Sequence, residues 1–369
     1  MGMRFDVCIR GGGVVGMSLA LQLASQRLRV GLVARAQPRP GDVRAYALNQ
    51  ASRALLQDLR VWPQPPDVTP VRQMQVWGDS GGAVAFDHAD AGEEALAWIV
   101  DVPALERQLA QAVSYQSQIE RLDDAAAPAL ADVALTVVCE GRASLTRGLL
   151  GTGFTTHAYH QHAIAARLHC ARPHGYTARQ WFSGSEVLAL LPMADDTVAL
   201  VWSVSDGRCD SLLQLPANQF QAALQQATGD QLGTLTLTSE RASWPLVLGE
   251  AAHWVGPGWA LAGDAAHSIH PLAGQGLNVG LADVAELARV LQARQGADYW
   301  RALGDVRLLR RYERARKADA AAMRGLTDGL HHLFAQDDRR WQLLRNTGMN
   351  AVARSGPVKR WLARQATGA

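Results

Sequence analysis

Lysine, cysteine and long apolar runs are all scarce in this sequence. The only lysines are Lys317 and Lys359, and no G-x-x-x-x-G-K-[ST] occurs, which excludes a P-loop and leaves almost no residue for Schiff-base catalysis. The cysteines form neither C-x-x-C pairs nor Cys/His clusters at zinc spacing, so we expect no metal site. Their scattered placement is typical of reduced cytosolic thiols, at Cys8, Cys139, Cys170 and Cys209.

The sequence also lacks the usual targeting signals. Arg4, Asp6 and Arg10 precede any apolar run, so the N-terminus does not resemble a signal peptide. No run of about 18 apolar residues is present, which predicts that no segment crosses a bilayer. We therefore expect a cytoplasmic protein, and we leave open peripheral contact with the inner face of the membrane.

Neither sign of charge dominates the whole chain of 369 residues. Lys and Arg number 36 against 34 Asp and Glu, which argues against a protein that wraps nucleic acid. The signs are unevenly distributed, however, because residues 301–369 hold 15 Lys and Arg against 6 Asp and Glu. The C-terminal part is therefore basic and the remainder is acidic.

The first 33 residues predict a strand, a helix and a second strand. Between the first strand and the helix lies Gly11-x-Gly13-x-x-Gly16. The glycines permit a tight turn and bring a pyrophosphate close to the free N–H groups at the helix N-terminus, which includes Val15. Because the motif follows a strand and opens a helix, we favour dinucleotide binding over a plain glycine-rich turn.

One part of this dinucleotide motif is missing. Such sites usually carry an acidic residue at the end of the second strand, and here Ala34 occupies that position and Arg35 follows it. The loss of a charged hydrogen bond costs about 1.5–3 kcal/mol. This substitution would weaken the binding of a large cofactor without excluding it.

A second glycine-rich segment spans residues 263–278 and reads GDAAHSIHPLAGQGLN. An apolar strand delivers Asp264 to a turn, and a glycine-rich loop opens a helix near Leu277. The carboxylate can accept hydrogen bonds from a polyol, and the helix N-terminus can stabilise negative charge near a ring system.

This segment resembles the flavoprotein aromatic hydroxylases of the para-hydroxybenzoate hydroxylase type, above all their ubiquinone-biosynthesis branch, the polyprenylphenol hydroxylases. In that branch it commonly reads GDAAH followed by HPLAGQGLN, as it does here. The stretch 42–48 resembles the family segment in which an arginine, here Arg44, touches the cofactor. A third family motif has Asp-Gly with a downstream Ser and Arg; Gly141, Ser144 and Arg147 match it, but Glu140 replaces the aspartate.

The resemblance covers most of residues 5–335 and implies FAD as the cofactor. It implies a flavin-positioning loop that contains Pro271, Gly274 and Gly276, and it assigns no catalytic base. The residues that it and the first motif place at the cofactor are Gly11, Gly13, Val15, Gly16, Ala34, Arg35, Arg44, Gly141, Asp264, Pro271, Gly274, Gln275, Gly276, Leu277 and Asn278. His267 and His270 flank the loop, and we expect them to brace it.

The expected fold is α/β, with a Rossmann-like FAD-binding domain, an inserted antiparallel-sheet substrate domain and a helical C-terminus. Four strand-like segments between residues 159 and 205 predict the inserted sheet, and a hairpin is expected around Gly81-Gly82. The expected domains are residues 1–72, 98–158 and 243–300 for FAD; 73–97 and 159–242 for substrate; and 301–369 for the helical region.

The resemblance also implies a reaction. NAD(P)H, a transient co-substrate, reduces FAD, which reacts with O2 to a C4a-hydroperoxide that hydroxylates a phenolic ring, here of a polyprenylated ubiquinone precursor. Two alternatives remain open: a flavin reductase or dehydrogenase without oxygenation, and a non-catalytic accessory subunit of a quinone-biosynthesis complex. A flavin halogenase is disfavoured, because neither lysine is well placed for its catalytic role.

The basic C-terminal region suggests partners beyond the aromatic substrate. Residues 358–364 (VKRWLAR) are short, basic and amphipathic. The simplest interpretation is a solvated helix face. The alternative is loose docking on an anionic membrane surface or on quinone-biosynthesis proteins, since each basic residue near such a surface contributes about 1 kcal/mol.

Overall fold

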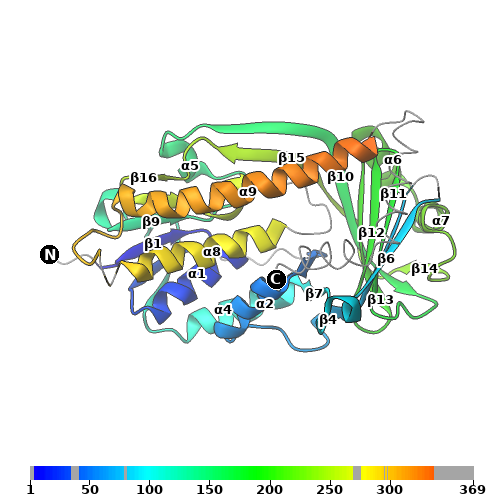
Figure 1. Cartoon of the computed structure of the whole chain (residues 1–369), viewed down its shortest axis with the longest axis horizontal. Helices are drawn as coiled ribbons and strands as arrows, with labels where there is room; N and C mark the ends of the chain where they lie inside the picture. Colours follow the sequence, from blue (N-terminus) through cyan, green and yellow to red (C-terminus); the bar gives the residue numbers. More distant parts are fainter. Residues whose placement is uncertain are drawn as a thin grey trace.

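The computed structural model describes residues 4–34, 41–78, 81–268, 276–294, 296 and 298–335, with side chains up to residue 321. It has a helix-covered half and a half dominated by one large sheet (Figure 1). No helix among the described residues is both long and apolar enough to cross a membrane.

The helix-covered half is built on a six-stranded sheet of order β16-β17-β9-β1-β2-β8. Neighbouring strands are parallel except β16, which pairs antiparallel with β17. The strands are β1 (Val7–Arg10), β2 (Val30–Val33), β8 (Ile119–Leu122), β9 (Leu135–Val138), β16 (Val255–Gly256) and β17 (Trp259–Leu261). The helices of this half are α1 (Val14–Ser25), α2 (Gln50–Asp58), α4 (Val102–Ser114), α5 (Leu145–Leu149), α8 (Gly276–Ala293) and α9 (Val306–Ala335).

The other half contains a nine-stranded sheet of order β18-β15-β10-β13-β12-β11-β5-β6, and β14 also pairs with β10. The strands are β5 (Gln73–Trp77), β6 (Ala83–Asp87), β10 (Phe154–Cys170), β11 (Thr177–Ser183), β12 (Glu186–Pro192), β13 (Thr197–Ser205), β14 (Leu235–Leu237), β15 (Ala242–Ala251) and β18 (His267–Ser268). Its outer face packs on α6 (Asp206–Gln214) and α7 (Ala217–Thr228). A short helix, α3 (His88–Ala91), follows β6.

A small antiparallel sheet of order β3-β7-β4 lies between the two halves. Its strands are β3 (Ala45–Leu48), β4 (Val68–Val71) and β7 (Ala97–Asp101). Ala45, Val71 and Ile99 of this sheet share one apolar cluster with Ala189 and Ala199 of the large sheet. The cluster therefore packs the inner face of the large sheet against the small sheet.

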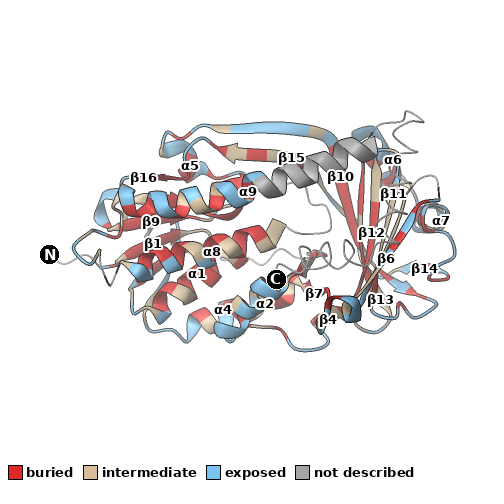
Figure 2. Ribbon diagram, viewed as in Figure 1, coloured by how far each residue is buried: buried red, intermediate tan, exposed pale blue. Residues whose placement is uncertain are grey.

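Burial explains why the central strands are so apolar. All four residues of β2 and of β9 are buried. One face of the parallel sheet packs on α1, α4 and α8, and on the other face Cys8, Val33 and Leu122 pack with Phe5 and Val133 of the adjoining loops. Figure 2 shows buried residues in both sheets and on the helix faces that meet them. The hydrophobic core of the helix-covered half includes the fully buried Trp254 and Tyr312, and it joins α9 to the strands of the parallel sheet.

The expected fold class is confirmed, and so are the hairpin of β5 and β6 and the four antiparallel strands β10, β13, β12 and β11. Several local expectations were wrong. The composition of residues 60–70, rich in proline, predicts a loop, but the stretch contains the start of β4. The apolar pattern predicts a helix over residues 48–59, and α2 begins at Gln50 because the Asn49 side chain caps it. The sequence interpretation missed β15 and α6. Strand β15 contains Pro245 and Gly249, which obscure the strand pattern.

The proposed domain ranges remain a prediction. Strand β15 lies within the range 243–300 that was expected to belong to the FAD-binding domain, and it pairs with β10 and β18 in the large sheet. Helix α9 packs on α8 of the helix-covered half. The range 243–300 therefore contains β15 of the large sheet as well as α8 of the helix-covered half.

Candidate active site

The first glycine-rich turn connects β1 to α1 in a conformation that only small residues allow. Gly11 has φ +123°, and a Cβ on Gly16 would lie 1.9 Å from the Gly11 carbonyl oxygen. Gly13 is the N-cap of α1 and supplies no side-chain capping bond, and apart from its chain neighbours no atom of the described residues lies within 4 Å of where its Cβ would be. No side chain among the described residues caps the first turn of α1, and its free N–H groups suit an anion.

The end of β2 offers no acidic group to a ribose. The Cβ atom of Ala34 lies 2.3 Å from where a Cβ on Gly12 would stand, so these two positions pack tightly. The Ala34 N–H donates to the carbonyl of Leu122 at 3.1 Å. Arg35 lies outside the described residues.

The second turn follows β17 and carries Asp264. Gly263 has φ +62°, and the Asp264 side chain is exposed. The surrounding protein nevertheless desolvates this carboxyl and raises its pKa, and the charges of His267, Arg142 and Arg44 only partly offset that rise. The Asp264 carboxylate is thus open on one side but surrounded by protein on the others, which suits it to accept hydrogen bonds from a polyol.

Val15 holds the two turns together. A Cβ on Gly263 would lie 3.3 Å from Val15 Cγ2, and one on Gly280 of α8 would lie 2.8 Å from the same atom. The side chain of Val15 therefore packs between the second turn and α8. Only its backbone N–H is left for a cofactor role.

Arg44 lies at the start of β3 with its charge already paired. Its guanidinium contacts the carboxylates of Asp42 at 2.5 Å and Glu106 at 3.2 Å. Burial alone would lower the pKa of Arg44, but the hydrogen bond to Asp42 and the nearby negative charges outweigh burial, and the pKa is raised. Its carbonyl accepts a hydrogen bond from Arg167 at 2.9 Å, and Arg167 also pairs with Asp101. Arg44 thus adds to the site a positive charge that two carboxylates hold in place.

The Glu140-Gly141 motif caps α5. The Glu140 carboxylate accepts hydrogen bonds from the hydroxyls of Ser144 at 2.7 Å and Thr146 at 2.6 Å, and from the Thr146 N–H at 3.1 Å. The buried Arg147 donates to the carbonyl of Ala265 at 3.0 Å. The longer side chain at 140 is therefore engaged by the N-terminal turn of α5, and Arg147 ties that helix to the turn of Asp264.

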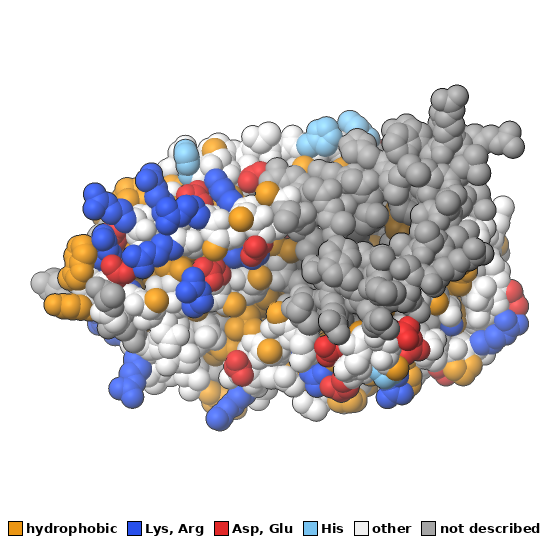
Figure 3. Space-filling view, in the orientation of Figure 1, with side chains coloured by type: hydrophobic (Ala, Val, Ile, Leu, Met, Phe, Trp, Pro, Cys, Tyr) orange, Lys and Arg blue, Asp and Glu red, His pale blue; other side chains and the backbone are white. Residues whose placement is uncertain are grey.

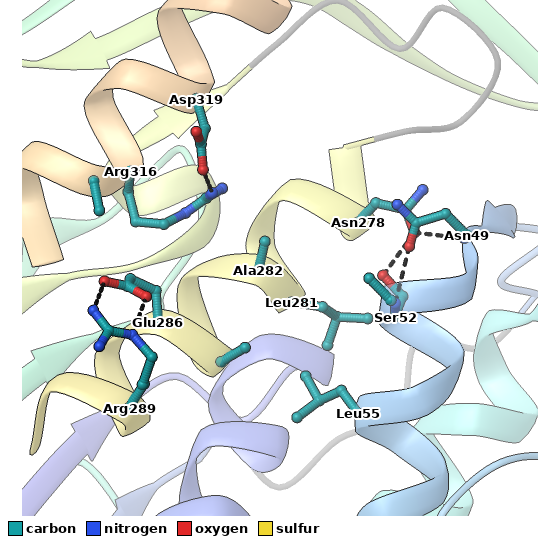
Figure 4. Close-up of a pocket in the computed structure, with 13 residues that line it drawn as sticks. Asn49, Ser52, Leu55, Asn278, Leu281, Ala282, Glu286, Arg289, Arg316 and Asp319 are labelled. Atoms are coloured by element: carbon teal, nitrogen blue, oxygen red, sulfur yellow. Dashed lines mark hydrogen bonds and ion pairs between the residues drawn. The ribbon is translucent and has the colours of Figure 1, made fainter. Parts of the chain in front are cut away.

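The start of α8 is tethered to α2 and β3 by one side chain. The Asn278 Oδ1 atom accepts hydrogen bonds from the Asn49 N–H at 3.0 Å and the Ser52 hydroxyl at 2.8 Å. Its Nδ2 donates to the Ala47 carbonyl at 2.8 Å. Figure 4 shows Asn278 pointing toward Asn49 and Ser52.

Several expected cofactor residues surround this helix start. Gly276 and Leu277 open α8, as expected. Pro271, Gly274 and Gln275 lie outside the described residues, as does His270. The Nε2 atom of His267 bonds to Asp283 at 2.8 Å, and its expected role as a brace of the loop stays a prediction.

The sequence interpretation missed two buried charged residues, Asp283 of α8 and Arg316 of α9. The Asp283 carboxylate is fully buried and binds the Gly263 N–H, His267 and Arg316. An aspartate among apolar residues on a helix face was the available signal at 283. Among the described residues no group of three or more His, Cys, Asp or Glu is arranged to hold a metal ion.

The two turns together fit FAD. The uncapped N-terminus of α1 suits a pyrophosphate, the space at Gly13 admits it, and the exposed Asp264 suits a ribityl chain. Ala34, at the end of β2, leaves that position without an acidic partner for the adenosine ribose.

Comparison with known proteins agrees with this geometry. The model of the FAD binding domain family matches residues 131–326. The chain is 32% identical to 3-demethoxyubiquinol 3-hydroxylase of Escherichia coli over 98% of each protein. It is 34% identical to ubiquinone hydroxylase UbiL of Rhodospirillum rubrum, over 98% of this chain and 89% of the relative.

Solved structures show the same fold. The p-nitrophenol 4-monooxygenase PnpA of Pseudomonas putida superposes with a TM-score of 0.79 at 16% identity, over 99% of this chain and 98% of the other. PqsL of P. aeruginosa in complex with 2-aminobenzoylacetate superposes with a TM-score of 0.78 at 20% identity, over 94% and 99%.

Fold, site and similarity thus define an FAD-dependent aromatic monooxygenase. Within that class, the chain belongs to the ubiquinone hydroxylase family.

Proposed function

We propose that this protein hydroxylates the aromatic ring of a polyprenylated ubiquinone precursor, with NAD(P)H as electron donor and O2 as co-substrate. The observation that carries the proposal is sequence identity above 30%, over 98% of this chain, to 3-demethoxyubiquinol 3-hydroxylase and to ubiquinone hydroxylase UbiL. The two glycine-rich turns that suit FAD support it. A similarity confined to the cofactor domain would support only a flavoprotein.

We propose the following roles for the chain's own residues. The N-terminus of α1 binds the pyrophosphate, Asp264 accepts hydrogen bonds from the ribityl chain, and the N-terminus of α8 stabilises negative charge on the flavin ring. Bound FAD supplies the redox and oxygen-activating chemistry. The contact residues proposed are Gly11, Gly13, Val15, Gly16, Ala34, Arg35, Arg44, Gly141, Asp264, Pro271, Gly274, Gln275, Gly276, Leu277 and Asn278.

The inner face of the large sheet is the proposed surface for the aromatic ring. Val187, Ser203 and Ala163 are in register across β12, β13 and β10. They share the face whose Ala189 and Ala199 pack on the small sheet, because side chains alternate along a strand. Trp244 of β15, opposite Ala163, ends this row of small side chains with a half-buried indole.

The electron donor is proposed to dock transiently. The chain contains one G-x-G-x-x-G motif, which we assign to FAD, so no second dinucleotide domain is predicted for NAD(P)H.

The proposed location is the cytoplasmic face of the membrane, with loose docking through the basic C-terminal region. Residues 301–369 carry an excess of arginine. Figure 3 shows Lys and Arg side chains gathered over the N-terminal part of α9. A substrate with a lipid tail would be collected at such a surface.

One experiment separates the proposal from its two alternatives. The purified protein is reconstituted with FAD, and NAD(P)H oxidation and O2 uptake are measured with and without a prenylated phenol under 18O2. A product that carries one 18O atom on the ring supports the proposal. Flavin reduction with no oxygenated product indicates a reductase, and a protein that cannot bind FAD indicates an accessory subunit, the alternative that Ala34 favours.

A further inference from the structure

Asp283 of α8 lies directly beneath the turn that carries Asp264. Its side chain is fully buried. The Oδ2 atom accepts hydrogen bonds from the Gly263 N–H and from His267 Nε2, both at 2.8 Å. Gly263 and His267 stand on either side of Asp264 in the sequence. One carboxylate oxygen therefore holds both ends of the turn.

The other oxygen of this carboxylate connects the turn to α9. Oδ1 accepts a hydrogen bond from Arg316 Nε at 2.7 Å. The buried Arg316 also pairs with Asp319 at 2.7 Å and donates to the Val279 carbonyl at 3.3 Å. Figure 4 shows Arg316 and Asp319 beside a cavity of about 290 Å3 that is lined by α2, α8 and α9.

His267 has a fixed orientation within this network. Its ring stacks on Trp254, with centroids 4.4 Å apart and an angle of 18° between the planes. Its Nδ1 atom is buried without a hydrogen-bond partner among the described residues. The stacking and the single bond to Asp283 therefore set the position of His267.

Stability alone does not account for this arrangement. Replacing a buried ion pair with well-packed apolar residues is often neutral or stabilising, whereas removing one partner is strongly destabilising. A buried carboxylate that receives three donors instead fixes one conformation of the backbone that it binds. The backbone fixed here is the one that presents Asp264.

We propose that Asp283 is a positioning residue for FAD, which acts with Arg316 and His267 to fix the Gly263–His267 turn and makes α9 part of the cofactor site. The network does not touch the proposed substrate surface. The inference rests on FAD as the cofactor and is independent of the substrate.

The test is FAD titration of apoprotein, without substrate, by quenching of flavin fluorescence. Asp283→Asn keeps the shape of the side chain but removes its charge, and we expect it to raise the Kd for FAD at least about tenfold, or 1.4 kcal/mol. Arg316→Lys keeps the charge but loses the guanidinium whose separate nitrogens reach Asp283, Asp319 and Val279, and it should raise the Kd by a smaller factor. The control is Arg314→Lys, since Arg314 is exposed on the same helix.

A double-mutant cycle separates positioning from a general loss of structure. If Asp283 acts through Asp264, then Asp283→Asn should cost much less FAD affinity in an Asp264→Asn background than in the wild type. The increase in Tm that saturating FAD produces should also shrink in Asp283→Asn. Additive effects, or an unchanged Kd with a lower apoprotein Tm, would overturn the proposal. If Asp283→Asn does not fold, the same cycle with Arg316→Lys decides.

Discussion

At the scale of single residues, Glu140 shows how one methylene changes a motif. The family aspartate is replaced by a glutamate whose two oxygens bind Ser144 and Thr146. Ser144 in turn caps α5 by accepting a hydrogen bond from the Arg147 N–H at 3.1 Å. The motif therefore stabilises the helix that places Arg147 against the Asp264 turn.

Ser144→Ala should destabilise the protein through this cap. Loss of an N-cap hydroxyl costs about 1 kcal/mol, and here the Glu140 carboxylate loses a donor as well. Urea unfolding should show the decrease in the free energy of unfolding. The matched control is Ser114→Ala, whose exposed hydroxyl bonds only to Gln111 in its own helix and should change little. Equal effects in the two variants would contradict this account.

Gly16→Ala should abolish tight FAD binding. The new Cβ would lie 1.9 Å from the Gly11 carbonyl, so the turn that receives the pyrophosphate must move. We expect a Kd for FAD more than about tenfold higher, measured by fluorescence titration. Gly148→Ala is the control, because nothing lies within 4 Å of that position and alanine favours its helix. A Kd within twofold of wild type for Gly16→Ala would refute the prediction.

Removing the charge of Asp264 and removing the charge of Asp283 should change the stability of the apoprotein in opposite directions. The pKa of Asp264 is raised by desolvation, so its contribution to stability is complete below its ordinary pKa and is lost as pH rises. Burial opposes ionisation of Asp283, but His267 and Arg316 lower its pKa, so its contribution is present at neutral pH and is lost as pH falls through that lowered pKa.

At pH 7, Asp264→Asn should therefore raise the Tm of the apoprotein, and Asp283→Asn should lower it. The Asp264→Asn difference should narrow as the pH is lowered toward about 4, whereas the Asp283→Asn difference should persist to about pH 4 and narrow only below it. Scanning calorimetry at several pH values measures this directly. Asp264→Asn should still weaken FAD binding, because stability and function conflict at this position. A lower Tm for Asp264→Asn at pH 7 would show that desolvation does not dominate there.

At the scale of elements, α8 organises the site. It lies against α1 through Gly280 and Val15, holds the second turn through Asp283, and meets α2 through Asn278. The periodicity of residues 277–291 predicts this helix well. Its three neighbours come from distant parts of the chain, so no local pattern identifies them.

Asn278→Ala should loosen the contact of α8 with α2 and β3. The change leaves the half-buried Asn49 N–H and Ala47 carbonyl without their partner, and because an unsatisfied buried group costs about 1–3 kcal/mol, we expect the lower end of that range for each. Chemical denaturation should show the loss. Asn278→Asp, which keeps the acceptor and loses the donor, should fall between alanine and wild type. If aspartate is as harmful as alanine, the acceptor is not what holds α2.

At the scale of the whole molecule, charge and catalysis are separated. The motifs for FAD lie before residue 300, whereas the last fifth of the chain is basic. The exception is Arg316, which lies in the basic region and reaches Asp283 in the core. The C-terminal helical region thus contributes a buried side chain to the core beneath the Asp264 turn.

Deletion of residues 355–369 should reduce binding to anionic vesicles. The deleted segment carries three Lys and Arg and no Asp or Glu, and each basic residue near an anionic surface contributes about 1 kcal/mol. Sedimentation with phosphatidylserine vesicles measures the effect, and neutral vesicles serve as the control. Retention of full binding by the truncated protein would assign docking to another surface.

The sequence by itself determined the cofactor class and the fold class. The glycine motif at 11–16 and the segment 263–278 are local patterns, and the positive φ of Gly11 and the close backbone approach at Gly16 require glycine at those two positions. Strands β10, β11, β12 and β13 and the hairpin of β5 and β6 were also predictable, since their alternation reflects burial on one face.

Only the tertiary structure decided how these parts support one another. Asp283 and Arg316 are far from Gly263 in sequence, and their roles depend on which side chains meet when α8 and α9 pack. Strand β15 and the strands of the small sheet, β3, β7 and β4, pair with strands that are distant in the sequence, so no local pattern indicates their partners or register. Contacts between segments that are remote in the sequence leave no local pattern, so only the three-dimensional structure shows them.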